Sequence, residues 1–150
     1  MKNLEVTEFW RYICEDLGYR FFSGTACGGL KSLYDNMDPM IMHYVPAVNE
    51  RVALGISTGV AISGDKCGVL MHVKNVKDVL NLLKFNRSYK LPILFIVYED
   101  EDSRLNSINN MLIDSFYLNF DTLRKDLTKL EKNTILKGKP GMIVIDKGVL

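Results

Sequence analysis

The sequence has few cysteines, few prolines and no excess of charge of either sign, and these shortages exclude several classes of protein. Its three cysteines are odd in number and lack any Cys-x-x-Cys spacing, which favours neither a disulfide framework nor a zinc site. Its 19 basic side chains almost balance its 18 acidic ones, so nothing predicts a nucleic-acid or anionic-membrane partner. Cysteines that form neither disulfides nor a zinc site are typical of a reducing compartment, so we expect a cytoplasmic protein.

Long apolar runs are also missing. Charged residues interrupt the N-terminal segment where a signal peptide would need an unbroken apolar core, and no later stretch is long enough to span a bilayer. With 150 residues, 47% of them hydrophobic, and only four prolines, the chain can bury one ordinary core. We therefore expect residues 1–150 to form a single domain that does not associate with membranes.

Apolar runs that suit buried strands alternate with segments of helical periodicity along the whole chain. The expected strands cover 20–23, 40–45, 67–71, 91–97, 116–118 and 142–145. The expected helices cover 7–17, 30–34, the segment after Glu50, 76–83, 108–113 and 121–130. Such alternation predicts a three-layer α/β fold with a mainly parallel sheet and helices on both faces.

Polar residues add local expectations to this pattern. Thr7 and Asp121 are typical of helix starts, and Gly18 is typical of a helix end. The acidic run 99–102 indicates a solvated loop after a strand. His43 suits a core or edge position on a strand, and Cys27 suits a packed thiol, although a helix N-terminus could activate it.

Glu50 is the candidate catalytic residue. It follows the short strand expected at 40–45 and opens a helix rich in small residues, so it should lie beyond the carboxyl end of a strand. Open α/β sheets bind ligands at that edge. A glutamate at this position is also what an ordinary helix N-terminus favours, because its charge complements the helix dipole.

The chain resembles the pyrimidine-binding domain of thiamine-diphosphate enzymes, in particular the phosphonopyruvate and sulfopyruvate decarboxylase group. The resemblance extends over almost the whole chain and depends on short motifs in a shared order. They are Gly24 with the turn to Leu30, Ala47-x-Asn49-Glu50, Ala53, Gly59, Ser63-Gly64, Leu70-Met71, Asn81, Tyr89-x-x-Pro92 and Lys147-Gly148.

This resemblance implies a cofactor and a role for Glu50. A carboxylate in the family contacts the aminopyrimidine ring of thiamine diphosphate and promotes its imino tautomer, and Glu50 would fill that role. By the same resemblance, Gly24, Asn49 and His72 would contact the cofactor.

Two segments depart from the family pattern. Relatives follow the strand that ends Leu-Met-Gln with an Asn-Ser-Gly-Leu-Gly-Asn turn, whereas this chain has 72–78 as His-Val-Lys-Asn-Val-Lys-Asp. Here Lys74 and Lys77 could meet an anionic substrate, with Asp78 beside them, or they could simply face water. Glu99-Asp100 also replaces a Trp-Arg-Gly-like turn, which leaves the substrate's identity open.

The function implied by the resemblance needs a second chain. The superfamily's diphosphate and magnesium site is recognised by Gly-Asp-Gly, and Gly64-Asp65-Lys66 does not match it. The chain therefore looks like the α subunit of a thiamine-diphosphate-dependent 2-oxoacid decarboxylase. A diphosphate-binding, β subunit-like partner would supply magnesium in a hetero-oligomer, and this chain would bind no metal itself. The alternative is a non-catalytic paralogue that serves as a small-molecule-binding or protein-interaction module.

Overall fold

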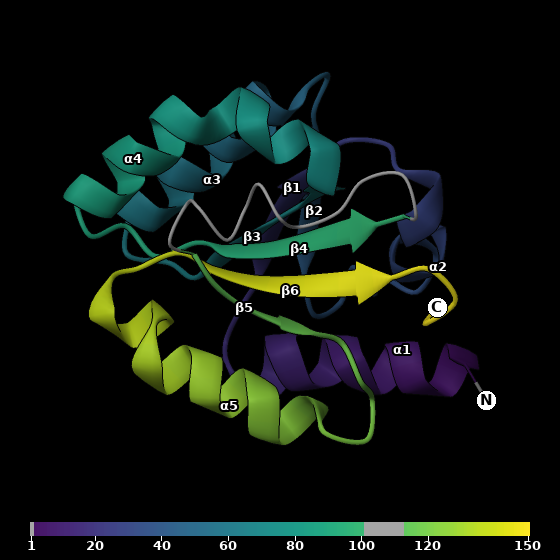
Figure 1. Cartoon of the computed structure of the whole chain (residues 1–150). Helices are drawn as coiled ribbons and strands as arrows, with labels where there is room; N and C mark the ends of the chain where they lie inside the picture. The colour runs from purple at the N-terminus through teal and green to yellow at the C-terminus, as the bar shows by residue number, and fades with distance from the viewer. Residues whose placement is uncertain (1, 101–112) are drawn as a thin grey trace.

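A six-stranded parallel sheet lies between two layers of helices in the computed structural model, which describes residues 2–100 and 113–150 (Figure 1). The strands are β1 (Phe21–Gly24), β2 (His43–Pro46), β3 (Cys67–His72), β4 (Leu94–Glu99), β5 (Asp114–Tyr117) and β6 (Gly141–Asp146). The α-helices are α1 (Lys2–Arg11), α2 (Lys31–Asp35), α3 (Glu50–Ile62), α4 (Leu80–Ser88) and α5 (Leu123–Asn133). Shorter turns are the π-helical η1 (Tyr12–Asp16) and the 3-10 helices η2 (Gly28–Leu30), η3 (Val73–Val79) and η6 (Ile135–Lys137).

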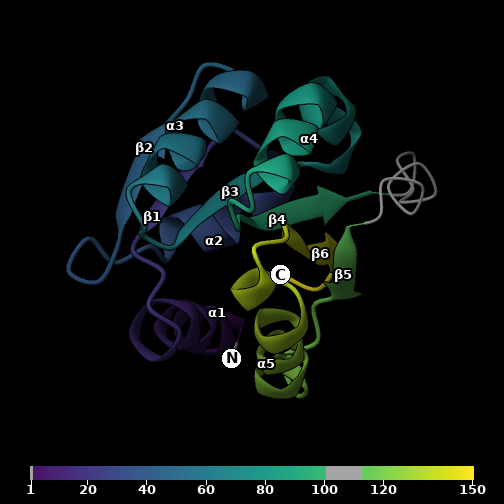
Figure 2. The same ribbon diagram turned by 90° about the vertical axis from the view of Figure 1, so that its left-hand side faces the viewer.

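Both faces of the sheet are covered. The strand order is β2-β1-β3-β4-β6-β5, and every neighbouring pair is parallel. Figure 2 shows α3 and α4 on one face and α1 and α5 on the other. The predicted fold class, a three-layer α/β fold with helices on both faces of a parallel sheet, is confirmed. None of the helices in the described residues is long and apolar enough to cross a membrane.

Side chains that alternate along the central strands supply the two cores. On β4, Leu94 and Ile96 join the core shared with α1, α2 and α5, whereas Phe95 and Val97 join the core shared with α3, η3 and α4. A strand buried on both faces needs apolar residues at every position, which is why β3, β4 and β6 appear in the sequence as continuous apolar runs.

Several local expectations were wrong. Helix α1 begins before Thr7, whose hydroxyl donates to the Asn3 carbonyl oxygen inside the helix at 2.8 Å. The residue that precedes α5 is Thr122, not Asp121, and its side chain makes no capping bond. Strand β2 starts at His43, three residues later than expected, because 38–42 form a turn. The helix expected over 108–113 falls, Ile113 apart, outside the described residues.

The connections after β1 and β3 leave the sheet toward opposite faces. Leu30 and Leu33, which follow β1, pack into the core on the α1 and α5 side, whereas Val73 and Val76, which follow β3, pack into the other core. Strands β1 and β3 are neighbours, so the carboxyl ends of these two strands form a topological switch point. Open α/β sheets bind ligands at such points.

Candidate functional site

Glu50 lies beyond the carboxyl end of β2, as its place in the sequence predicted, and its side chain reaches the switch point between β1 and β3. It is the first residue of α3, and the Asn49 side chain caps the helix by accepting the Val52 N–H at 3.0 Å. An asparagine at the N-cap satisfies a backbone donor that the helix itself cannot pair. The cap thus fixes the point at which the half-buried Glu50 leaves the backbone. The cofactor contact expected for Asn49 stays a prediction, and its amide oxygen is already used by the cap.

The Glu50 carboxylate accepts hydrogen bonds from both sides of the switch point. Its Oε1 accepts the Thr25 hydroxyl at 3.0 Å and the Asn75 amide at 2.8 Å. Thr25 follows β1 directly, and Asn75 lies in η3 after β3. Oε2 has no hydrogen-bond partner among residues 2–100 and 113–150. One oxygen is therefore held by the protein, and the other can accept from a ligand.

Gly24 ends β1, and close packing explains why this position carries no side chain. A Cβ here would lie 2.6 Å from the Leu70 carbonyl oxygen of β3 and 3.3 Å from the Tyr34 hydroxyl. Real Cβ atoms do not approach a backbone oxygen so closely, so any larger residue would push the two strands apart. Gly24 thus sets the spacing of the switch point, and its contact with a cofactor stays a prediction.

His72 uses both ring nitrogens inside the protein. Its Nδ1 accepts the Lys74 N–H at 3.2 Å and caps η3, and its Nε2 lies 2.9 Å from an Asp100 carboxylate oxygen. Because Nδ1 accepts, the neutral ring carries its proton on Nε2 and donates it to Asp100. A ligand could then contact His72 only at its ring carbons. The cofactor contact predicted for this residue would therefore be an apolar contact without a hydrogen bond.

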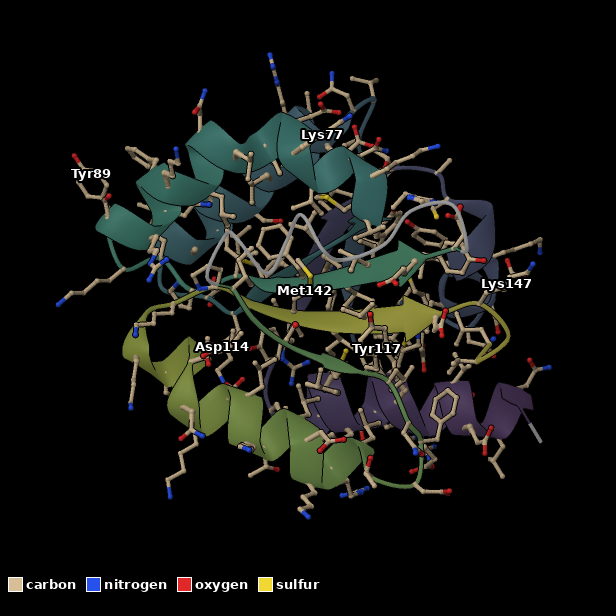
Figure 3. The ribbon with its side chains drawn as sticks, in the orientation of Figure 1. Lys77, Tyr89, Asp114, Tyr117, Met142 and Lys147 are labelled. Atoms are coloured by element: carbon tan, nitrogen blue, oxygen red, sulfur yellow. The ribbon has the colours of Figure 1, made fainter. Side chains whose placement is uncertain are left out.

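The two lysines of the altered segment lie in different surroundings. Both are exposed, and Lys77 lies on the outer side of the layer that α3 and α4 form (Figure 3). Lys74 directly follows the Val73 that begins η3 and lies near Cys27 of the β1 connection. Asp78 is exposed, and its carbonyl oxygen accepts the Arg51 Nε–H at 3.3 Å. Lys74 is thus the lysine nearer the switch point.

Cys27 is half-buried at the start of η2, and its thiol stays protonated near neutral pH. Burial raises the pKa of this thiol, although the backbone N–H groups of Gly29 and Leu30 and the charge of Lys74 act in the opposite direction. A raised pKa disfavours the reactive thiolate. The structure thus agrees with a packed thiol, the more ordinary of the two readings given to Cys27.

Glu99 was expected in a solvated loop, and this was wrong. It is the last residue of β4, it is only 8% exposed, and its carboxylate accepts the Tyr117 hydroxyl at 2.9 Å. Tyr117, labelled in Figure 3, ends β5, which β6 separates from β4 in the sheet. Asp100 is also engaged, by His72, while Glu101 and Asp102 lie outside the described residues. The two described residues of the acidic run are therefore held by hydrogen bonds.

Thr25 and Asn75 are the site residues that sequence reasoning missed. Thr25 could have been found because it directly follows a strand that ends at the switch point. Asn75 stood in the sequence only as a replaced glycine, and nothing there tied its amide to Glu50. No group of three His, Cys, Asp or Glu side chains that could hold a metal ion occurs within residues 2–100 and 113–150.

Comparisons with known proteins support the resemblance found in the sequence. No family model matches the chain. The chain is 32% identical over 85 residues to the sulfopyruvate decarboxylase subunit alpha of Methanococcus maripaludis, a match that covers 55% of this chain and 50% of the relative. The matched part thus spans half the length of that relative. These findings confirm the predicted resemblance to the sulfopyruvate decarboxylase family.

A solved structure shares the fold at low sequence identity. The 2-oxoglutarate:ferredoxin oxidoreductase from Magnetococcus marinus, solved with 2-oxoglutarate, coenzyme A and succinyl-CoA bound, superimposes with a TM-score of 0.78. The match covers 99% of this chain and 29% of that chain at 12% identity. At this identity the match confirms the fold and carries no statement about activity.

Proposed function

We propose that this chain is the α subunit-like part of a thiamine-diphosphate-dependent 2-oxoacid decarboxylase of the sulfopyruvate or phosphonopyruvate type. A separate diphosphate-binding chain would complete the site and supply the magnesium. The observation that carries the proposal is the geometry of Glu50, whose Oε1 is held by Thr25 and Asn75 while Oε2 stays unpaired among the described residues. The partial likeness to a sulfopyruvate decarboxylase subunit alpha supports it.

The residues at the switch point fit the aminopyrimidine part of the cofactor. A ring nitrogen that exchanges a proton needs a carboxylate oxygen that the protein has not already used, and Glu50 Oε2 meets that need. Glu50 would hold the ring, with Gly24, Asn49 and His72 as the further contacts. When bound, thiamine diphosphate supplies the nucleophilic carbon that attacks the 2-oxo group.

The chain's own residues would have three tasks. Glu50 would hold and release a proton at Oε2 while Thr25 and Asn75 keep its carboxylate from rotating. Lys74 would attract the second anionic group of the substrate from a solvent-exposed position near the β1 connection. Lys77 and Asp78, predicted alongside Lys74, lie farther along η3, so we assign them weaker roles.

The outward face of α3 is where we expect the partner chain. Gly55 and Gly59 have open space around them, and Val52 and Ile62, each three residues from one of them on the same helix, are 41% and 66% exposed. Because α3 begins at Glu50, a chain packed on this face would reach the same helix that carries the catalytic candidate. Small residues allow backbones to approach closely, and burying exposed apolar side chains would stabilise the complex.

A non-catalytic binding module is the second candidate, and one observation favours it. The segment that carries flexible glycines in relatives is here the 3-10 helix η3, with Val73, Val76 and Val79 buried. Such a helix cannot open toward a ligand as a glycine turn can, because three apolar anchors hold it.

One titration separates the two candidates. Thiamine diphosphate and Mg²⁺ are titrated by calorimetry into this chain with and without the chain encoded next to it, and loss of sulfopyruvate or phosphonopyruvate is then followed. We expect cofactor binding and turnover only with both chains together. Absence of cofactor binding in the mixture, with a complex of the two chains demonstrated, would favour the module.

A further inference from the structure

Two hydrogen-bond donors converge on one oxygen of Glu50, and they come from segments that lie far from it in the sequence. Thr25 precedes Glu50 by 25 residues and Asn75 follows it by 25. A carboxylate with one donor can still rotate about its last side-chain bond. Two donors at 3.0 and 2.8 Å from opposite sides of the switch point fix the plane of the group.

The Thr25 donor is itself held in place. Thr25 is 9% exposed, its N–H donates to the Leu70 carbonyl oxygen at 3.3 Å, and its carbonyl oxygen accepts the Tyr34 hydroxyl at 2.6 Å. Gly24, just before it, lets β1 approach β3 so closely that a Cβ here would lie 2.6 Å from the Leu70 carbonyl oxygen. The hydroxyl therefore approaches Glu50 from a backbone that is fixed on both sides.

The Asn75 donor is held through η3. This helix is capped by His72, whose Nδ1 accepts the Lys74 N–H, and the His72 ring is oriented by Asp100. Val73 and Val76, which flank Asn75 along the helix, are 4% and 0% exposed and anchor η3 to the core. Asn75 thus points its amide at Glu50 from a helix fixed at its start and along its buried face.

We propose that Thr25 and Asn75 are the positioning residues of this site, a two-donor clamp that locks Oε1 of Glu50 so that Oε2 alone meets the ligand. Calling Oε2 the reacting atom rests on the proposed function, whereas the clamp itself can be tested in the chain alone. The clamp also explains segment 72–78, where this chain has the helix η3 in place of the glycine turn of its relatives. That helix positions Asn75, one of the two donors.

The first experiment asks whether the clamp exists, and it needs no activity. Thr25→Val removes the hydroxyl at nearly constant volume, Thr25→Ser keeps it, and Asn75→Leu removes the amide. Each is combined with Glu50→Leu, which removes the acceptor, and thermal midpoints are measured. We expect Thr25→Val and Asn75→Leu each to lower the midpoint by about 3 °C with Glu50 present and by much less with Glu50→Leu. Asn81→Leu, at an exposed asparagine of α4, is the matched control and should show no dependence on Glu50.

The second experiment asks what the clamp does in the two-chain complex. We expect Thr25→Val and Asn75→Leu to lower kcat about tenfold or more. The dissociation constant of thiamine diphosphate should change less than about threefold, because a misplaced carboxylate disturbs the geometry of the reacting atoms more than it weakens cofactor binding. Thr25→Ser should restore kcat. If the clamp only stabilised the fold, these substitutions would lower the thermal midpoint without lowering kcat more than cofactor affinity.

The outcomes separate the clamp from the proposed function. Additive midpoints in both Glu50 cycles would overturn the clamp, whatever the complex does. Tighter cofactor binding in Asn75→Leu would also overturn it, because Asn75 would then be blocking Glu50 rather than positioning it. If the unaltered complex fails to bind thiamine diphosphate but the midpoints are non-additive, the proposed function is refuted. The clamp then stands, and only the assignment of Oε2 as the reacting atom loses its support.

Discussion

The parallel strands all begin at one edge of the sheet, the amino edge, and all end at the other, the carboxyl edge. Each of these edges holds a carboxylate that accepts hydrogen bonds, but the two carboxylates are held differently. At the amino edge, Glu131 is 6% exposed and uses both oxygens: Oε2 accepts the Tyr19 hydroxyl at 2.7 Å, and Oε1 pairs with the Lys66 ammonium group. Lys66 also donates to the Leu17 carbonyl oxygen at 2.8 Å. At the carboxyl edge, Glu50 has two neutral donors on one oxygen and none from the described residues on the other.

We interpret this difference as that between a carboxylate that stabilises the fold and one that, under the proposed function, meets a ligand. A buried charge must be paired, and Tyr19 and Lys66 together engage both oxygens of Glu131. Neither oxygen of Glu131 is therefore left to bind a ligand. Glu50 is held by dipoles without a salt bridge in the described residues, so the protein keeps the group in position without using up its second oxygen. Changes at the carboxyl edge should therefore affect activity, and changes at the amino edge should affect stability.

Glu50→Gln is the strongest test of this contrast. We expect kcat of the two-chain complex to fall by about a thousandfold, because an amide cannot exchange the proton, while the thermal midpoint changes little. Turnover and midpoint are measured on the same preparations. Decarboxylation at the normal rate by Glu50→Gln would remove Glu50 from the catalytic role.

A substitution on the outer face of α3 tests whether the carboxyl edge depends on a partner. Ile62→Asp places a charge where an apolar side chain is 66% exposed. We expect affinity for the partner chain to fall about a hundredfold, since the charge would be buried in the interface, with the fold of the isolated chain unchanged. Sedimentation of the mixture measures the effect. Leu136→Asp is the control, because this equally exposed residue lies in η6. Equal loss in both variants would place the partner elsewhere.

Glu131→Gln tests the amino edge. We expect the free energy of unfolding to fall by about 2 kcal/mol, because Lys66 loses its charge partner but is partly exposed and can turn toward water. Chemical denaturation measures this loss. Turnover per folded complex should stay normal, and a kcat effect as large as that of Glu50→Gln would end the distinction between the two edges.

The structure also shows which parts of this contrast the sequence could predict. The apolar runs at 67–71 and 142–145 predicted β3 and β6 to within a residue, because strands buried on both faces must be apolar throughout. The same reasoning placed Glu50 beyond the end of a strand. The clamp could not be predicted, because the contacts of Thr25 and Asn75 depend on the register of β1, β2 and β3. Glu99 was misjudged for the same reason, since its partner Tyr117 lies on another strand.

Lys74→Ala should have a smaller effect, limited to substrate binding. Because Lys74 is exposed, we expect the Michaelis constant for a sulfonated 2-oxoacid to rise about fivefold at low salt and less at high salt, where ions screen the charge. Lys77→Ala, on the outer side of the same segment, is the matched control and should change the constant less. Steady-state kinetics at two salt concentrations measure both. Equal effects of the two lysines would contradict the assignment of Lys74 as the nearer one.

Lys90→Gly should have the smallest effect and should strengthen the protein. Lys90 lies two residues beyond the end of α4 and has a φ of 55°, a left-handed conformation that costs a residue with a side chain about 1 kcal/mol or more, and Gly138 packs against its backbone. The Leu91 N–H donates to the Asn86 carbonyl oxygen at 2.8 Å, which fixes the turn in this conformation. Glycine relieves the strain at some entropic cost, so we expect a gain of about 0.5 kcal/mol in the free energy of unfolding. Lys84→Gly, inside the same helix, should instead lose about 1 kcal/mol. Because Lys90 lies before β4, at the amino edge, kcat should be unchanged in both variants, and any loss of turnover in Lys90→Gly would show that this edge also contributes to the site.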